Sequence, residues 1–388
     1  MSEWKEVELG EIINLKRGYD LPNSNRVGGG VPIISSSGVT GCHNLHKEIG
    51  PGVVTGRYGT LGEFYYIKPG EKYWPLNTTL FVEDFKGNDP EFIYYLLSTL
   101  GFGKLGHKSA VPGLNRNELH EILVGIPDSD TQKEIARTLS IIDKKITLLH
   151  QQNRDLEDLA QTLFKRWFVE FEFPNENGEP YKSSGGKMVE SELGEIPEGW
   201  KVASLSSIAN FLNGLACQKY PVEDENAKLP VLKIKELGSG ISENSDWATS
   251  NVDPKYIVQT GDVIFSWSGT LMLKIWDGDD CVLNQHLFKV TSQQFPQWFI
   301  NQWTRIHLQY FILVAQSKAT TMGHIKRSHL DEALCLIPSD KVLTQCNGAF
   351  DSMFVSFVNN NKEIRTLIKL RDTLLPKLMS GELRVKSK

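Results

Sequence analysis

The feature that most constrains this chain is a long internal repeat, with a period of about 208 residues. Each half opens on a Trp-Lys pair, at Trp4 and Trp200, and closes on an Ile-Pro pair, at Pro127 and Pro338. Between these landmarks, both halves carry an apolar run that leads into Gly-Thr. With 388 residues, the chain is long enough for two units that each bury a core. The repeat therefore predicts two copies of one module.

A different periodicity follows each module. After Pro127, apolar residues recur every seven positions from Ile135 to Leu163, with a companion stripe four residues later. The same phase returns in the second half, from Leu343 to Leu378. Two such stripes are the a and d positions of a heptad repeat, which is typical of coiled-coil helices. Each module is therefore predicted to lead into a helix that spans roughly 50 Å at 1.5 Å per residue.

Asn153 and Asn361 occupy the same heptad slot near the middle of the two predicted helices. A buried Asn at an a position costs stability but fixes the register of a coiled coil. Either the two amides pair across the seam, or each faces water where the seam frays. We favour the first alternative and assign both residues to helix register.

Turn-forming residues fill the segment between the first helix and the second module. Such a segment allows the chain to reverse, so that the helices lie antiparallel. The predicted fold class is α+β, a pseudo-twofold dumbbell in which two similar modules are separated by two long antiparallel coiled-coil helices. The predicted boundaries are 1–130 for the first module, 131–172 for the central spacer helix, 173–198 for the linker, 199–338 for the second module and 339–384 for the distal spacer helix.

Charge and cysteine content limit the environment and the partners. The net charge of −5 argues against a free-standing basic DNA clamp, because nonspecific affinity for DNA comes from Lys and Arg facing phosphates. A DNA-binding chain of this kind concentrates its basic residues locally or uses the positive charge of a partner. Five scattered cysteines without a CxxC pair indicate reduced thiols. We find no signal peptide and no apolar run long enough to cross a membrane, so we expect a cytoplasmic protein.

Motifs that would indicate an enzyme are missing or fail. Gly185-Gly186-Lys187 lacks the spacing and the hydroxyl of a nucleotide-binding P-loop, and no Asn-Pro-Pro-Tyr segment of a base methyltransferase is present. Asp143, followed by two lysines, superficially resembles part of a metal nuclease signature, but it falls in the heptad helix. Cys42, His43 and His46 lack a convincing fourth ligand for structural zinc. We therefore predict no catalytic residue and no metal site.

Taken together, these features make the chain resemble the specificity subunits of type I restriction–modification systems, over essentially its whole length. The residues that carry the resemblance are the two Trp-Lys openings, Arg57-Tyr58-Gly59-Thr60, Pro112-Gly113-Leu114-Asn115-Arg116, Met322-Gly323-His324-Ile325-Lys326-Arg327, Leu163-Phe164-Lys165-Arg166-Trp167-Phe168 with Phe171-Glu172-Phe173-Pro174, and the tail from Leu374 to Leu383. No single motif is decisive, but their order and duplication together are specific.

The resemblance implies a division of labour in host defence. Each module would be a target recognition domain that reads one half of a bipartite site in double-stranded DNA. The helices would set the unread gap and dock two methyltransferase subunits, which would methylate adenine, and restriction subunits would cut the DNA. This chain would hold no cofactor, since S-adenosylmethionine would be bound by the methyltransferase, and ATP and Mg by the restriction subunit.

The candidate DNA-binding residues lie in loops at matched positions of the two modules. Arg and Lys favour guanine and Asn favours adenine in the major groove. Arg116 and Arg327 carry the most weight because they recur 211 residues apart, although a recurring Arg can also be an ion pair that stabilises the fold. The full set is Arg57, Tyr58, Lys104, His107, Lys108, Asn115 and Arg116 in the first module, and Trp267, Ser268, Lys318, Thr320, His324, Lys326 and Arg327 in the second.

A non-DNA adaptor, with duplicated protein-binding modules on a coiled coil, is the alternative. The negative net charge slightly favours it. Basic loops at matched positions and the resemblance over the whole chain weigh against it. Binding of the assembled complex to DNA with a steep salt dependence would distinguish the two, because phosphate contacts release counterions.

Overall fold

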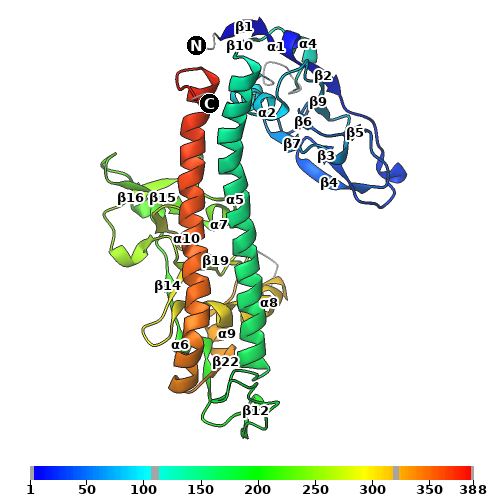
Figure 1. Ribbon diagram of the computed structural model, residues 1–388. Helices are drawn as coiled ribbons and strands as arrows, with labels where there is room; N and C mark the ends of the chain where they lie inside the picture. The colour runs from blue at the N-terminus through cyan, green and yellow to red at the C-terminus, as the bar shows by residue number, and fades with distance from the viewer. Residues whose placement is uncertain (1–3, 106–112, 318–322, 386–388) are drawn as a thin grey trace. The chain divides into compact units, whose positions relative to one another are not determined.

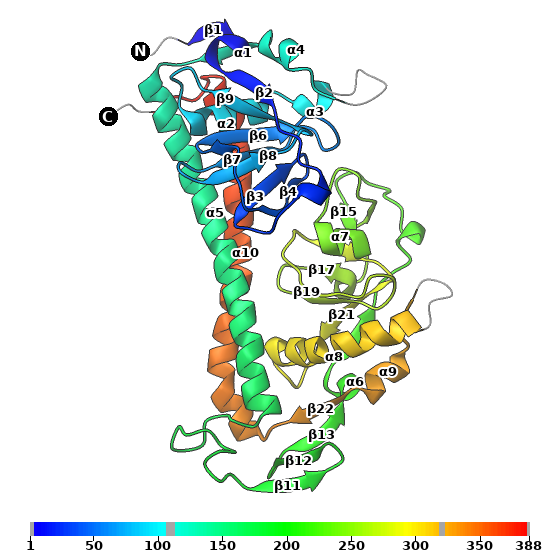
Figure 2. The ribbon, with the colours of Figure 1, turned by 90° about the vertical axis from the view of Figure 1, so that its right-hand side faces the viewer.

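The computed structural model describes residues 4–105, 113–317 and 323–385, and for residues 104 and 105 only the backbone. The chain divides into two compact units. Unit 1 comprises residues 1–147 and 367–388, and unit 2 comprises residues 148–366. Each unit contains one module and one stretch of each long helix, and Figures 1 and 2 show the elements.

The first module consists of two four-stranded sheets and a closing strand pair. One sheet has the order β2-β9-β6-β7, with β2 at Asn14–Arg17, β9 at Thr79–Asp84, β6 at Gly52–Gly56 and β7 at Phe64–Ile67. The other has the order β4-β3-β8-β5, with β4 at Gly38–His43, β3 at Val31–Ser35, β8 at Lys72–Pro75 and β5 at Glu48–Ile49. The closing pair is β1 (Lys5–Glu8) with β10 (Leu123–Ile126), and the helices are α1 (Leu9–Ile12), α2 (Pro90–Thr99), α3 (Phe102–Leu105) and α4 (Arg116–His120).

The second module repeats this plan. Its sheets have the orders β14-β21-β18-β19 and β16-β15-β20-β17, and β13 (Lys201–Ser204) pairs with β22 (Leu334–Ile337). The strands are β14 (Asn210–Asn213), β21 (Leu287–Thr291), β18 (Val263–Ser266), β19 (Leu273–Ile275), β16 (Trp247–Thr249), β15 (Lys228–Leu232), β20 (Cys281–Leu283) and β17 (Ile257–Val258). The helices are α6 (Leu205–Ile208), α7 (Ile234–Ser239), α8 (Gln297–Ser317) and α9 (Arg327–Glu332).

The two strand orders correspond one for one. In each module one parallel pair, β3 with β8 and β15 with β20, lies inside a sheet whose other pairs are antiparallel. Because a parallel pair needs a crossover connection, two independent chains rarely arrive at the same mixed order. The topology therefore supports a duplication, and the mixed helix-and-sheet content confirms the predicted α+β class.

A helix that lies on each first sheet supplies much of the core. Asp89 is the N-cap of helix α2, where its side chain accepts the N–H of Phe92, and Pro90 occupies the first helical position. Both residue types favour a helix start. Phe92 and Ile93 are fully buried, as are Phe299 and Ile300 of α8. Each such side chain contributes roughly 1.5–3 kcal/mol by leaving water, so α2 and α8 fix the sheets that carry the loops described below.

The two long helices are α5 (Ser129–Phe164) and α10 (Asp340–Met379), which cover the predicted heptads. In unit 1, Leu139 shares one apolar cluster with Leu378, and Asp143 pairs with Arg371. In unit 2, the rings of Phe164 and Phe350 lie 6.0 Å apart. Within each unit, later residues of one helix thus contact earlier residues of the other, so the segments run antiparallel.

Structured elements also fill the predicted linker. A π-helical turn, Lys165–Val169, ends α5, and a hairpin of β11 (Met188–Ser191) and β12 (Gly194–Pro197) precedes the second module. Phe173 stacks on Tyr181 and on Trp200, with ring centroids 4.5 and 5.3 Å apart. Turn-rich composition here thus accompanies a packed segment rather than an open tether. No helix in the described ranges is long and apolar enough to cross a membrane.

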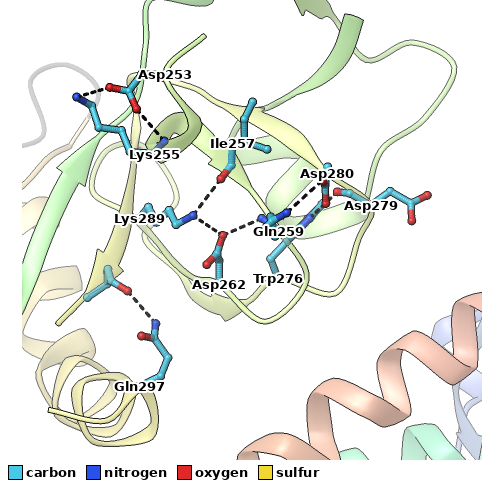
Figure 3. A network of polar contacts seen from close by, with 11 residues as sticks. Asp253, Lys255, Ile257, Gln259, Asp262, Trp276, Asp279, Asp280, Lys289 and Gln297 are labelled. Atoms are coloured by element: carbon cyan, nitrogen blue, oxygen red, sulfur yellow. Dashed lines mark hydrogen bonds and ion pairs between the residues drawn. The ribbon is translucent and has the colours of Figure 1, made fainter. Parts of the chain in front are cut away.

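A polar network ties the two sheets of the second module together (Figure 3). Lys289 of β21 contacts Asp262 with an Nζ–Oδ2 distance of 2.7 Å and donates to the Ile257 carbonyl of β17 at 3.0 Å. Asp262 also accepts the N–H of Gln259 at 2.7 Å. The Lys289 and Asp262 side chains are only 14% and 23% exposed, whereas those of the neighbouring pair Lys255–Asp253 are 52% exposed.

We expect Asp262→Ala to lower the free energy of unfolding by about 2 kcal/mol. The substitution leaves the N–H of Gln259 without its acceptor, and it leaves the mostly buried Lys289 ammonium with the Ile257 carbonyl but no counter-charge. The matched control is Lys255→Ala, which breaks an exposed pair and should cause no measurable change, since solvent screens such pairs. Urea unfolding of both variants tests this. Equal midpoints for the two variants would contradict the role of the buried pair.

Candidate nucleic-acid interface

In the first module, two predicted loops lie against each other. The loop that leaves β6 carries Arg57 and Tyr58, and the loop that enters α4 carries Leu114 and Asn115, with Arg116 as the first residue of the helix. The N–H of Leu114 donates to the Arg57 carbonyl at 2.9 Å, and Tyr58 forms a β-bridge with Gly113. Segments more than fifty residues apart in the sequence thus form one surface.

The second module builds the same arrangement with the same hydrogen bonds. The N–H of Ile325 donates to the Trp267 carbonyl at 3.0 Å, and Ser268 forms a β-bridge with His324. Trp267 and Ser268 thus stand where the first module has Arg57 and Tyr58. We call this arrangement the loop frame: residues 57–58 with 113–116 in the first module, and residues 267–268 with 323–327 in the second. Its backbone is common to both modules, and the side chains on it differ.

Side chains on the first frame divide into free and engaged groups. Arg116 is exposed and makes no hydrogen bond or ion pair within the described ranges of the chain. The Arg57 guanidinium lies 4.7 Å from the ring centroid of Tyr58, which is 41% exposed. Asn115 caps α4, because its side chain accepts the N–H of Asn117 and donates to Glu118. Arg116 and the Arg57–Tyr58 pair are thus available to a ligand, whereas Asn115 stabilises the helix that presents Arg116.

On the second frame, aromatic contacts hold most of the predicted residues. Trp267 stacks on Phe288 with centroids 5.7 Å apart, and its indole N–H donates to Asn213 Oδ1 at 3.1 Å. The Arg327 guanidinium lies 5.6 Å from the Phe288 ring and donates to the Phe211 carbonyl at 3.2 Å. Unlike Arg116, Arg327 is therefore fixed by its own module.

The remaining residues of the second frame differ in exposure. Ser268 is buried, and its hydroxyl hydrogen-bonds His286 Nδ1 at 3.1 Å. His324 is exposed, with its ring edge-on to Trp267. Lys326 is exposed at the start of α9, where its N–H donates to His329 Nδ1. His324 and Lys326 thus remain open to solvent beside Trp267 and Arg327.

Part of the predicted set cannot be placed. His107, Lys108, Lys318 and Thr320 lie outside the described residues, and for Lys104 only the backbone, in α3, is described. Their role in DNA binding remains a prediction from the sequence.

Beside each loop frame lie polar residues that were not among the predicted DNA-binding residues. In the second module these are Asn213 and Gln285, beside His286 and Trp267. At the corresponding place in the first module, Asn77 donates to Asp20, which also pairs with Arg17 at 3.2 Å. No sequence pattern marks these residues, because the sheet register brings them together.

A polar pocket of about 440 Å³ lies beside Arg327. Ser206, Asn210, Ser292 and Asp331 line it together with Arg327. Such donors and acceptors suit a polar group rather than an apolar one. In the described part of the chain, no group of three or more His, Cys, Asp or Glu side chains could hold a metal ion.

The two heptad asparagines meet in unit 2. Asn153 Nδ2 donates to Asn361 Oδ1 at 2.7 Å, and Asn360 Nδ2 donates to Asn153 Oδ1 at 2.9 Å. Asn153 and Asn361 are only 5% and 7% exposed. The two amides are therefore in contact across the helix pair, as a role in register requires.

Comparison with known proteins agrees with the duplicated architecture. The family model described as "Type I restriction modification DNA specificity domain" matches the chain twice, at residues 1–158 and 197–341. The type I restriction enzyme MjaIX specificity subunit of Methanocaldococcus jannaschii is 30% identical, over 76% of this chain and 69% of that protein. The HindI specificity subunit of Haemophilus influenzae is 23% identical, over 99% of this chain and 100% of that protein.

A solved structure shares the fold. The crystal structure of a type I restriction–modification system S subunit from M. genitalium superposes with a TM-score of 0.61. The superposition covers 97% of this chain and 96% of that chain, at 14% sequence identity. The double family match, the relatives and the shared fold place the chain: it belongs to the family of type I restriction–modification DNA specificity subunits.

Proposed function

We propose that this chain is the non-catalytic, DNA-reading subunit of a type I restriction–modification complex and that each module reads one half of a bipartite site. The observation that supports this most is the loop frame common to both modules. Its backbone hydrogen bonds repeat, while Arg57 and Tyr58 are replaced by Trp267 and Ser268. Similar frames with different side chains suit two different short sequences, because each base pair presents its own donors and acceptors in the major groove.

The long helices act as the spacer of a pseudo-twofold dumbbell. A coiled coil of roughly 50 Å exceeds one turn of DNA, about 34–36 Å, so modules at its two ends can address separate groove segments. The proposed domains follow the predicted boundaries, with target recognition domains at 1–130 and 199–338 and helices at 131–172 and 339–384. The linker at 173–198 reverses the chain between them.

Partners supply the charge and the chemistry that this chain lacks. With a net charge of −5, it needs basic surfaces from its partners to hold the DNA phosphates. Two methyltransferase subunits dock on the helices and bring S-adenosylmethionine, and restriction subunits bring the ATP- and Mg-dependent cleavage. The complex works in the cytoplasm, where its DNA substrate lies.

The proposed DNA-binding residues are those of the two loop frames. Arg116 contacts DNA most directly, and Arg57 with Tyr58 lies beside it. In the second module, His324, Lys326 and Arg327 form the corresponding surface, with Trp267 and Ser268 beneath. Lys104, His107, Lys108, Lys318 and Thr320 belong to the proposed set from the sequence alone.

The decisive experiment maps methylated adenines across the genome of the host, with and without this gene. Loss of one split motif, two short half-sites around a fixed gap, supports the proposal and gives the sequence that is read. If no motif disappears while the partner methyltransferase is expressed, the chain does not direct methylation, and the protein-binding adaptor becomes the better explanation.

We expect Asn153→Leu to change the gap between the two half-sites. Leucine removes the amide that bonds both Asn361 and Asn360, so the helices can repack in another register. Methylation mapping of the variant measures the gap directly. The matched control is Gln152→Leu, which changes an exposed amide one residue away and should leave the gap unchanged. An unaltered gap in Asn153→Leu would show that these amides do not set the spacing.

A further inference from the structure

The second module contains a pocket that the loop frame does not explain. It has a volume of about 460 Å³ and lies on the sheet β16-β15-β20-β17. Cys217, Val231, Lys233, Trp247 and Asn284 contribute to its lining. This volume falls within the range of small-molecule and cofactor sites, about 300–1,000 Å³.

The first module fills the corresponding place with large apolar side chains. In the parallel pairs, Ile33 lies opposite Trp74 and Val231 lies opposite Val282. Trp74 is thus replaced by the much smaller Val282. Trp74 packs with Leu21, Ile33 and Leu76 in one buried cluster.

Close backbone contacts show that Gly18 of the first module corresponds to Gly214 of the second. A Cβ at Gly18 would come within 2.1 Å of the Leu76 carbonyl oxygen, and one at Gly214 within 2.3 Å of the Asn284 carbonyl oxygen. Leu21 and Cys217 each lie three residues after these glycines and therefore correspond. Leu76 and Asn284 correspond because each contacts the matching glycine. The second module has therefore exchanged three large or apolar core residues for smaller or polar ones.

The mouth of the pocket also differs between the modules. Trp247 pairs with Pro230 on β15, at the position where Cys42 pairs with Pro32 in the first module. Trp247 is 47% exposed, and Lys228 Nζ lies 5.0 Å from the centroid of its ring. Its indole provides a flat surface at the pocket on which a planar ring can stack.

The polar groups in the pocket suit the edge of a heterocycle. Asn284 is only 6% exposed, and a carboxamide offers one acceptor and two N–H donors, the combination that pairs with adenine in DNA readers. Lys233 and Asp246 form an ion pair at the lining. Burial raises the pKa of the Cys217 thiol, so this side chain is a neutral part of the wall.

Hydrogen bonds link the pocket to the loop frame of the same module. The Asn284 side-chain oxygen accepts the N–H of His286 at 3.3 Å, and His286 Nδ1 lies 3.1 Å from Ser268 Oγ. Ser268 belongs to the loop frame. Asn284 is thus joined to the loop frame through one residue, His286.

We propose that this pocket of the second module binds a single nucleobase that has left the stack of the DNA half-site. The inference rests on the proposed function, since it takes the ligand from the DNA that the loop frame holds. The base stacks on Trp247 and presents its edge to Asn284. The first module, where Trp74 and Leu76 occupy the equivalent positions, reads its half-site without such a base.

The test uses the chain assembled with its two methyltransferase subunits and duplex DNA that contains its site. Single 2-aminopurine residues replace the bases of each half-site in turn, because the fluorescence of this analogue rises when it unstacks. We expect a rise at one position in the half-site of the second module, other than the methylated adenine. Trp247→Cys, which installs the residue of the first module, should abolish that rise and weaken DNA binding about tenfold.

Further variants keep the result specific. Asn284→Leu, again copying the first module, should also abolish the rise, while Tyr310→Ala, which removes an exposed aromatic ring of α8, should not. Because Trp247 is exposed, its replacement should leave the circular dichroism spectrum unchanged.

Different failures have different meanings. If the complex binds and methylates its site but no position other than the methylated adenine brightens, the pocket proposal is overturned and the proposed function stands. If the complex does not bind DNA, both are overturned. Titration with free nucleosides checks the other source of the same chemistry: binding that depends on Trp247, without an unstacked base in DNA, would assign the pocket to a free nucleoside and overturn the DNA-base proposal.

Discussion

Arg116→Ala is expected to weaken the binding of the assembled complex to its DNA site by roughly 5- to 150-fold, which corresponds to about 1–3 kcal/mol. The side chain is exposed and makes no hydrogen bond or ion pair with the described residues, so its removal should not change the free energy of unfolding. Fluorescence anisotropy with the specific duplex measures the affinity.

The manner of the loss separates two kinds of contact. If Arg116 contacts a phosphate, Arg116→Ala should weaken all sequences alike and reduce the salt slope by about one. If it contacts a base, methylation should relax at one position of one half-site. Arg137→Ala is the matched control, since it removes an exposed Arg of α5; an equal affinity for the two variants would contradict a DNA contact by Arg116.

Arg327→Ala should behave differently, although Arg116 and Arg327 are equivalent in sequence. Its guanidinium donates to the Phe211 carbonyl and lies over the Phe288 ring. The variant should therefore lose stability in the second module as well as affinity for DNA. The fold-stabilising contact is thus present for Arg327, whereas the ligand contact of Arg116 stays a prediction.

Much of the architecture could be predicted because it depends on patterns between residues that are close in the sequence or repeated along it. The repeat of landmarks predicted two modules, and the heptad spacing predicted the positions of α5 and α10. Periodicity reports which face of a helix is apolar, and this information is local in the sequence. One missed signal was also local: Asn115, followed three residues later by Glu118, is a helix-capping pattern, and the structure uses Asn115 in that way.

The rest depends on strand register, which the sequence does not state. Trp267 contacts Asn213 across 54 residues because β14, β21 and β18 are neighbours in one sheet. The equivalence of Trp74 and Val282 follows from which residues lie opposite each other in two parallel strand pairs. A change of register by one residue would turn both side chains to the other face, so the pocket of the second module could not have been found from composition or motif spacing.

Asp143→Ala is expected to lower the free energy of unfolding of unit 1 by about 2–3 kcal/mol. Asp143 of α5 accepts the hydroxyl of Tyr95 at 2.7 Å and pairs with Arg371 of α10 at 2.9 Å. Its removal leaves a buried hydroxyl without its acceptor and a partly buried guanidinium without this carboxylate. Hydrogen exchange of the α2 amides gives the local readout, and Lys133→Ala, an exposed pair member on α5, is the matched control.

At alkaline pH the stability of this cluster depends on the Tyr95 hydroxyl. Burial, and then the hydrogen bond to Asp143, raises the pKa of the Tyr95 hydroxyl above its ordinary 10.0. A group whose pKa is raised on folding stabilises the fold fully below its unfolded pKa, and this contribution is lost as the pH rises toward the folded value. Wild type and Asp143→Ala should therefore both lose stability above about pH 10, where the unfolded tyrosine ionises, and the deficit of the variant should stay constant there. It should shrink only at a higher pH, where Tyr95 ionises in the folded variant, because burial alone still raises its pKa.

A triple variant distinguishes a lost pair from an unfilled space. Arg371 occupies a d position of the predicted heptad, where leucine is the ordinary residue. Asp143→Leu, Arg371→Leu and Tyr95→Phe together remove the carboxylate, the guanidinium and the hydroxyl that meet here, and apolar replacement of a whole ion pair is often neutral or stabilising. Asp372, the other partner of Arg371, is 57% exposed and stays hydrated. We expect this variant to regain most of the stability that Asp143→Ala loses. A triple variant as unstable as Asp143→Ala would mean that the carboxylate stabilises unit 1 by contacts other than those with Tyr95 and Arg371.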